Sequence, residues 1–125
     1  MAAPNIVGVN TITGITTYLS LADTNATVLV TNAASSNYVY KINTIVVAND
    51  DGSSSADITV AINDAAAGAG SNYALASTVA VAADSSLVVT DKASAFYLEE
   101  NRSIVVTASA ANDLDVMCSY DAIID

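Results

Sequence analysis

Short segments of alternating apolar and polar residues, separated by clusters of turn-forming residues, constrain the fold of this chain more than any other feature. In residues 56–62 every second side chain is Ala, Ile or Val, and residues 73–81 carry a similar pattern. Successive side chains of a strand point to opposite faces, whereas a helix repeats every 3.6 residues or so. Because helical periodicity is weak throughout, the pattern predicts strands.

The expected strands can be placed along the chain. After a short N-terminal segment at 5–9, strands are expected at 11–21, 26–31, 38–48, 56–62, 73–81, 86–91, 95–98, 103–109 and 114–124. The pair Asp51-Gly52 predicts a hairpin turn at 49–52, because Asp-Gly accepts positive φ at little cost. Many short strands without helices between them predict an all-β chain, a single antiparallel β-sandwich of jelly-roll type. The length of 125 residues fits one domain.

The N-terminal segment 1–22 differs in composition from the rest of the chain. It is apolar and rich in Thr, and it contains no charged residue, whereas residues 23–125 carry all of the Asp, Glu, Lys and Arg. We therefore distinguish residues 1–22, an edge strand of this domain or an arm that adds to a neighbouring chain's sheet, from a β-sandwich domain at 23–125. Apolar side chains of this segment and two nearby tyrosines form the predicted interface: Ile6, Val7, Val9, Ile12, Ile15, Tyr18, Tyr38 and Tyr40.

Side chains suited to catalysis are few. The sequence has no His, one Cys (Cys118) and three Lys or Arg residues against 13 Asp or Glu. Enzymes usually take their bases, nucleophiles and cationic groups from His, Cys, Lys and Arg. We therefore expect no catalytic residues, no cofactor and no enzymatic activity. A net charge of −10 also opposes binding to nucleic acid or to an anionic membrane surface.

Carboxylates are the one plentiful reactive group. Asp50-Asp51, Glu99-Glu100 and the pair Asp113/Asp115 lie in or beside expected turns, where solvation is their ordinary state. Two alternatives are a cation bound by oxygen ligands at 49–57 or 112–115, and a hydrolase with paired carboxylates. The hydrolase would need one strongly raised carboxylate pKa in a cleft. No metal ligands are assigned.

Several strand–turn–strand blocks resemble small β-rich virion proteins of tailed bacteriophages, especially those of marine cyanophages. The resemblance spans roughly residues 28–123 and lies in the blocks 40–52, 56–60, 73–78, 97–100 and 108–114. These blocks are structural rather than catalytic, so no functional residue is carried over from the family.

The resemblance implies a virion structural protein on the capsid surface, made in the host cytoplasm. We expect a capsid decoration (cement) protein that binds the phage major capsid protein and forms a homo-oligomer, with a trimer favoured. One alternative is a tail, neck or fibre module of the particle, including one that contacts host-surface carbohydrate. Another is an unrelated β-sandwich such as a pilus or surface-layer subunit.

Overall fold

The computed structural model describes residues 4–125. In this part of the chain the strands are β1 (Thr11–Ser20), β2 (Thr27–Asn32), β3 (Val39–Asn49), β4 (Ala56–Asn63), β5 (Asn72–Val81), β6 (Ser86–Thr90), β7 (Phe96–Leu98), β8 (Arg102–Ala108) and β9 (Leu114–Ile124), with a 3-10 turn, η1 (Lys92–Ser94), before β7. Each strand begins and ends within one residue of the range expected from the sequence. No helix among these residues has the length and apolarity needed to cross a bilayer.

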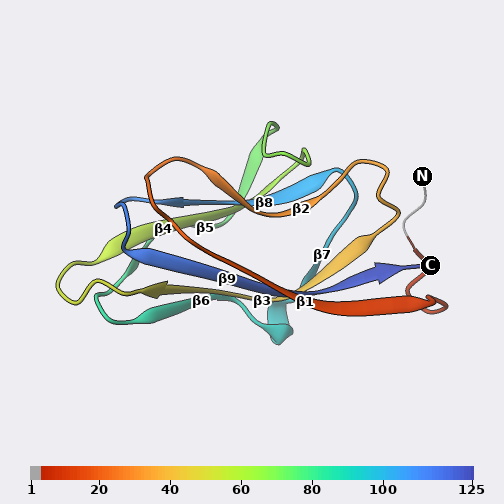
Figure 1. Ribbon diagram of the computed structural model, residues 1–125, viewed down its shortest axis with the longest axis horizontal. Helices are drawn as coiled ribbons and strands as arrows, with labels where there is room; N and C mark the ends of the chain where they lie inside the picture. The colour runs from red at the N-terminus through yellow and green to blue at the C-terminus, as the bar shows by residue number, and fades with distance from the viewer. Residues whose placement is uncertain (1–3) are drawn as a thin grey trace.

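The strands form two antiparallel sheets that lie face to face (Figure 1). Sheet A has the order β1-β9-β3-β6, with the short β7 also paired to β3, and sheet B has the order β2-β8-β4-β5. Apart from β7, the first strand pairs with the last, the second with the second-last, and so on inward to β4 and β5. A long antiparallel ribbon wrapped into two layers gives this pairing, which is the jelly roll. The predicted all-β sandwich is confirmed.

The core lies between the two sheets and is built by the alternation read from the sequence. From sheet A, Ile42, Ile45 and Val47 are fully buried, and they face Ile58 and Val60 of sheet B. Burying an aliphatic side chain of this size stabilises the fold by about 1.5–3 kcal/mol relative to leaving it exposed. The inward face of each strand therefore holds the layers together, and the outward faces are left for other roles.

Three asparagines at strand ends hold the connections that follow them. Asn32, Asn49 and Asn63 are the last residues of β2, β3 and β4, and all three are buried. The amide of Asn49 donates to the carbonyl of Val81 at 2.9 Å, and Asn63 accepts from the amide nitrogen of Gly70 at 2.9 Å. Among residues 4–125, every buried side-chain nitrogen and oxygen has a hydrogen-bond partner. The buried amides thus replace ladder bonds where the chain leaves a sheet.

The predicted hairpin at 49–52 is wrong. β3 belongs to sheet A and β4 to sheet B, so residues 50–55 connect the two layers rather than two neighbouring strands. The Asp-Gly signal is local, whereas β3 finds its partners in β9 and β6, which lie far along the chain. The segment at 5–9 is a turn, in which the Gly8 nitrogen donates to the Asn5 carbonyl at 3.1 Å.

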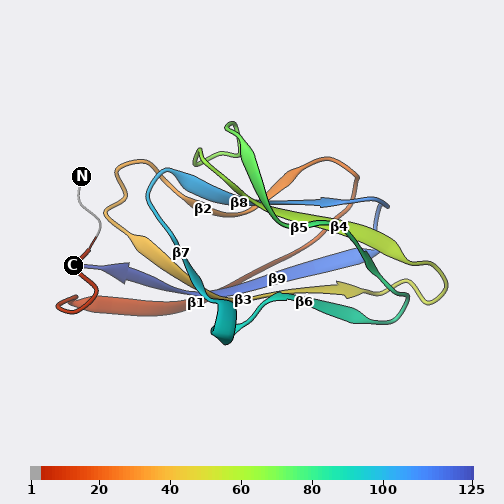
Figure 2. The ribbon, with the colours of Figure 1, turned by 180° about the vertical axis from the view of Figure 1, so that it is seen from behind.

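The outer face of sheet B is partly covered by the loop 64–71, which rises above that sheet in Figure 2. Gly68 lies at its centre with φ of 75°, and a Cβ there would sit 3.2 Å from Val28 and 3.3 Å from Val105. The two valines point out of the sheet, and Val105 is nevertheless buried. Only glycine combines this backbone conformation with so close an approach. On the outer face of sheet A, Val39 and Ile123 are buried near the termini, whereas Tyr18, Met117 and Val88 are exposed.

Candidate interaction surface

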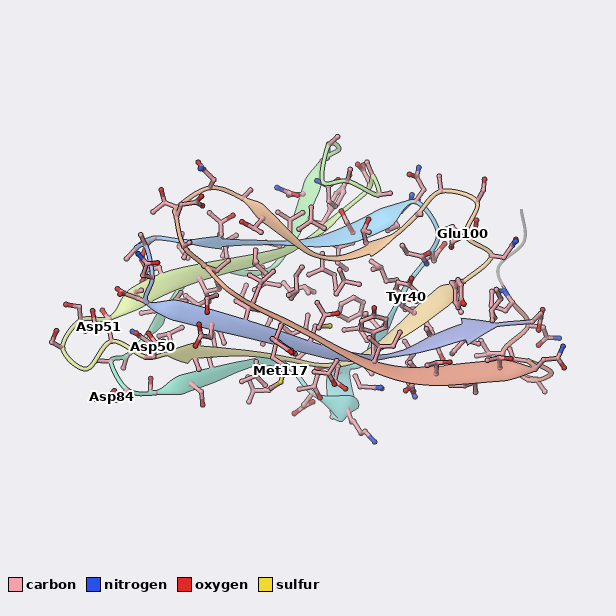
Figure 3. All side chains as sticks on the ribbon, viewed as in Figure 1. Tyr40, Asp50, Asp51, Asp84, Glu100 and Met117 are labelled. Atoms are coloured by element: carbon pink, nitrogen blue, oxygen red, sulfur yellow. The ribbon has the colours of Figure 1, made fainter. Side chains whose placement is uncertain are left out.

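Four apolar side chains cross the outer face of sheet A in register. Tyr18 of β1 lies opposite Met117 of β9, which lies opposite Val46 of β3, and Val46 lies opposite Val88 of β6. Tyr18 is 77% exposed, Met117 42% and Val88 57%. Figure 3 shows Met117 on the side of sheet A that faces away from sheet B. We call these four residues the apolar row; a contiguous exposed strip of this kind is typical of a contact surface.

A shallow groove of about 340 Å³ runs beside the apolar row. Tyr18, Val46 and Met117 line it together with Ala48 and Asp115. The Asp115 carboxylate accepts a hydrogen bond from the Ser20 hydroxyl at 2.5 Å, so it is held at the edge of the groove. The surface can therefore receive an apolar side chain, with one carboxylate at its border.

Strand β1 forms one edge of sheet A. It pairs with β9 at ten consecutive positions without a register shift, and within residues 4–125 no strand pairs with its other side. Natural proteins usually protect such an edge with Lys, Pro, a bulge or a covering segment. Thr11–Ser20 contains no charged residue and no proline, and most of its side chains are exposed. The edge is open to a further strand.

Six of the predicted interface residues lie in or before β1, and five of them, all except Ile15, do not pack on the core cluster. Ile6 and Val7 are exposed in the turn that precedes the strand, and Val9 is half-buried. Ile12 and Tyr18 are exposed at even positions of β1, which place them on the outer face of sheet A. Ile12 and Tyr18 thus share a face, with Tyr18 also in the apolar row.

The other three predicted interface residues lie against the core. Ile15, Tyr38 and Tyr40 are partly buried and pack on the core cluster, and Figure 3 shows Tyr40 between the sheets. The Tyr40 ring centroid is 4.7 Å from that of Tyr120 and 5.8 Å from that of Tyr38. Burial, and then the neighbouring Tyr120 and Tyr38, raise the pKa of Tyr40. Ile15 takes an inward, odd-numbered position of β1, so it does not join the outer surface.

Met117, Val46 and Val88 were not predicted as surface residues. Each is an apolar side chain at a position where the alternation of its strand expects a polar one. That mismatch was readable for each residue alone, but only the register of sheet A brings the three into one row.

Acidic side chains gather at the end of the sandwich opposite the termini. Figure 3 shows Asp50, Asp51 and Asp84 there. Hydrogen bonds from Ser53 hold the pKa of Asp51 below its usual range, whereas burial and the Asp51 and Asp50 carboxylates raise that of Asp113. In residues 4–125 no three Cys, Asp or Glu side chains are grouped as metal ligands would be. Asp113 also lies in a turn rather than in the groove.

The single cysteine, Cys118, lies where its thiol can act neither as a nucleophile nor as a metal ligand. Cys118 is fully buried on the inner face of β9, and burial raises the pKa of its thiol to about 12. A nucleophilic or metal-binding cysteine acts as a thiolate, which needs a lowered pKa and access to solvent. Cys118 therefore serves as a small apolar core residue.

Comparison with family models and with curated proteins finds no match to this sequence. Among solved structures, a chain of the Bacillus endospore appendages, which are disulfide-linked pili, is 16% identical with a TM-score of 0.54, covering 94% of this chain and 91% of that one. The Ralstonia phage GP4 capsid has 13% identity and a TM-score of 0.46, covering 100% and 92%. The cyanophage Pam1 capsid has 13% identity and a TM-score of 0.40, covering 100% and 93%. The appendage chain and this chain share a fold.

Proposed function

We propose that this chain is a non-enzymatic structural protein of a phage particle, a capsid decoration protein that binds the shell through the outer face of sheet A. The observation that carries the proposal is the apolar row, which is exposed and uncovered on an otherwise acidic protein. The sequence resemblance to virion proteins of tailed phages supplies the kind of particle, and the major capsid protein is the proposed partner.

The two faces of the sandwich differ in a way that suits this role. The loop 64–71 covers part of sheet B, whereas the apolar row leaves Tyr18, Met117 and Val88 exposed. Burying such side chains contributes about 1.5–3 kcal/mol each, before the costs of association are subtracted. One contact of this size is weak, but a decoration protein is added many times to a lattice. Contacts made by a linked oligomer then reinforce one another.

The charge of the chain fits the same role. A net charge of −10 opposes non-specific aggregation of the protein before it reaches the particle. The apolar row itself contains no charged side chain, and Asp115 at the border of the groove is the one carboxylate beside it.

A fibre-forming subunit is the second candidate, because the endospore appendage chain has the same fold and assembles into pili. Those pili are disulfide-linked. Cys118 is this chain's one cysteine and is buried, so a folded copy offers no thiol for such a link. A fibre built from this chain would have to rest on non-covalent contacts.

Copy number distinguishes these roles. In purified particles of the phage that encodes this chain, quantitative mass spectrometry should find it in numbers comparable to the major capsid protein. Empty heads separated from tails should retain it. A few copies per particle that stay with the tail would favour the tail or fibre module, and absence from the particle would refute a virion role.

The surface is tested by substitution on those heads. Met117→Lys should abolish rebinding of the purified protein to heads stripped of it, while Tyr73→Lys, at an exposed position of sheet B, should rebind as the unchanged protein does. Circular dichroism checks that both variants are folded. Equal rebinding of the two would remove the apolar row from the proposal.

A further inference from the structure

The free edge of β1 suits a second copy of the same strand. Its ten residues carry no charge, whereas the chain as a whole carries −10, so two copies meet least repulsion along this edge. The regular pairing with β9 shows that the strand is straight enough to continue the sheet. An edge strand offers unpaired N–H and C=O groups along its length, which an antiparallel copy can satisfy.

The exposed side chains of β1 select one register for this pairing. A two-fold axis perpendicular to the sheet keeps outer faces on the same side, so each residue must lie opposite one of the same parity. With the axis at Ile15, Ile12 lies opposite Tyr18 of the second copy, and Tyr18 opposite its Ile12. These are the two large apolar side chains exposed on the outer face of β1. A shift of the axis to Thr16 would instead set Tyr18 against Gly14.

We propose that two copies of this chain pair β1 to β1 in antiparallel fashion, across a two-fold axis at Ile15, to form one continuous sheet. Aromatic and β-branched residues directly opposite one another are a favourable cross-strand pair. The apolar row then continues from Tyr18 onto Ile12 of the second copy. In that copy Ile12 is in turn opposite Ile123 of β9.

The carboxylates nearest to the edge do not oppose this arrangement. Asp121 and Asp115 of β9 lie opposite Gly14 and Ser20, so each is one strand removed from the junction. The β9 carboxylates of the second copy are at least three strand spacings away, about 14 Å for spacings of about 4.8 Å. This exceeds the screening length of about 8 Å at physiological ionic strength. On its other side Asp121 is opposite Lys41, which offsets part of its charge.

This pairing adds to the proposed function by specifying how the chain binds a second copy of itself. The proposed homo-oligomer is a dimer, in place of the trimer expected from the sequence. One free edge joined to its own copy closes after two chains, because no unpaired side of β1 remains for a third. The inference rests on the proposed function only for its biological setting. It is tested on the isolated protein, so failure of the pairing would leave the copy-number result untouched, and the reverse also holds.

Charge substitutions test the edge. Light scattering should give twice the chain mass of 12.6 kDa for the unchanged protein. Ile12→Lys combined with Tyr18→Lys sets like charges opposite each other and should give the monomer. Ile12→Lys combined with Tyr18→Glu sets opposite charges together and should restore the dimer. Val88→Lys, on the far strand of the same face, should remain dimeric, and circular dichroism should show all variants folded.

Cross-linking tests the register. An Ile12→Cys protein mixed with a Tyr18→Cys protein should form a covalent heterodimer under mild oxidation, because directly opposite residues lie within disulfide reach. Mixing Val88→Cys with Tyr18→Cys should not. A monomer or a trimer in solution, or equal cross-linking of the two mixtures, would overturn the proposal. Failure of the opposite-charge variant to recover the dimer would overturn the register.

Discussion

Replacing Asn49 by alanine should cost about 2–4 kcal/mol of the free energy of unfolding. The amide nitrogen of Asn49 donates to the Val81 carbonyl at 2.9 Å and to the Ser54 carbonyl at 3.0 Å, and its oxygen accepts from the Asp51 nitrogen at 2.9 Å. Each such hydrogen bond is worth about 1 kcal/mol net. Water can reach the partners at Ser54 and Asp51, so those two losses are partly recovered. The carbonyl of Val81 is buried, and leaving it unpaired costs about 1–3 kcal/mol.

The assay is urea unfolding followed by far-ultraviolet circular dichroism, with the midpoint compared at unchanged slope. Asn25→Ala is the matched control, because Asn25 is exposed in the connection between β1 and β2 and should change stability by less than about 0.5 kcal/mol. Asn49→Asp should be worse than alanine at neutral pH, since a carboxylate would face two carbonyls, and should partly recover in acid. Equal midpoints for Asn49→Ala and Asn25→Ala would refute the reasoning that buried amides hold the strand ends.

Three further outcomes are expected. Gly68→Ala should destabilise the protein by about 1–2 kcal/mol in the same urea assay, because its φ is positive and its Cβ would press on two valines, whereas Gly14→Ala, with open space around it, should not. Asp113→Asn should raise the melting temperature at pH 7, because the raised pKa of Asp113 means that its charged form is disfavoured in the folded state. This gain should vanish as the pH falls through that pKa. An unchanged melting temperature in calorimetry at low salt and pH 7 would contradict this. Cys118 should resist a thiol reagent at pH 8 in the native protein and react fully in urea, and rapid native labelling would show that the inner face of β9 opens.

Strand positions could be predicted from the sequence because they depend on local alternation. The nine ranges agree with the structure to within one residue. The connection at 50–55 could not be predicted, because which sheet a strand joins depends on partners far along the chain. In β5 the single apolar face expected at 73–81 is interrupted by two register shifts against β4, with Thr78 at positive φ, so Ala76 rather than Leu75 lies opposite Val60.

Composition alone predicted some residues of the candidate surface and misplaced others, because it does not show which face of a sheet a side chain takes. Ile12 and Tyr18 stood out as apolar residues in an uncharged segment, and the structure places them on one exposed face. Tyr38 and Tyr40 carried the same compositional signal but pack against the core. Tyrosine suits both settings, since it has an apolar ring and a polar tip, and only the position of each side chain relative to the sheets decides between them.

The loop 64–71 also makes the outer faces of the two sheets different from each other. In the seating proposed above, in which sheet A contacts the shell, the loop that Gly68 holds over Val28 and Val105 faces the surrounding medium. Two of its exposed residues, Ala67 and Ala69, lie on sheet B's side of the sandwich, away from the proposed contact. An epitope or fluorophore inserted beside them would be displayed outward on every copy, and the repeating lattice would become an ordered array of whatever the loop carries.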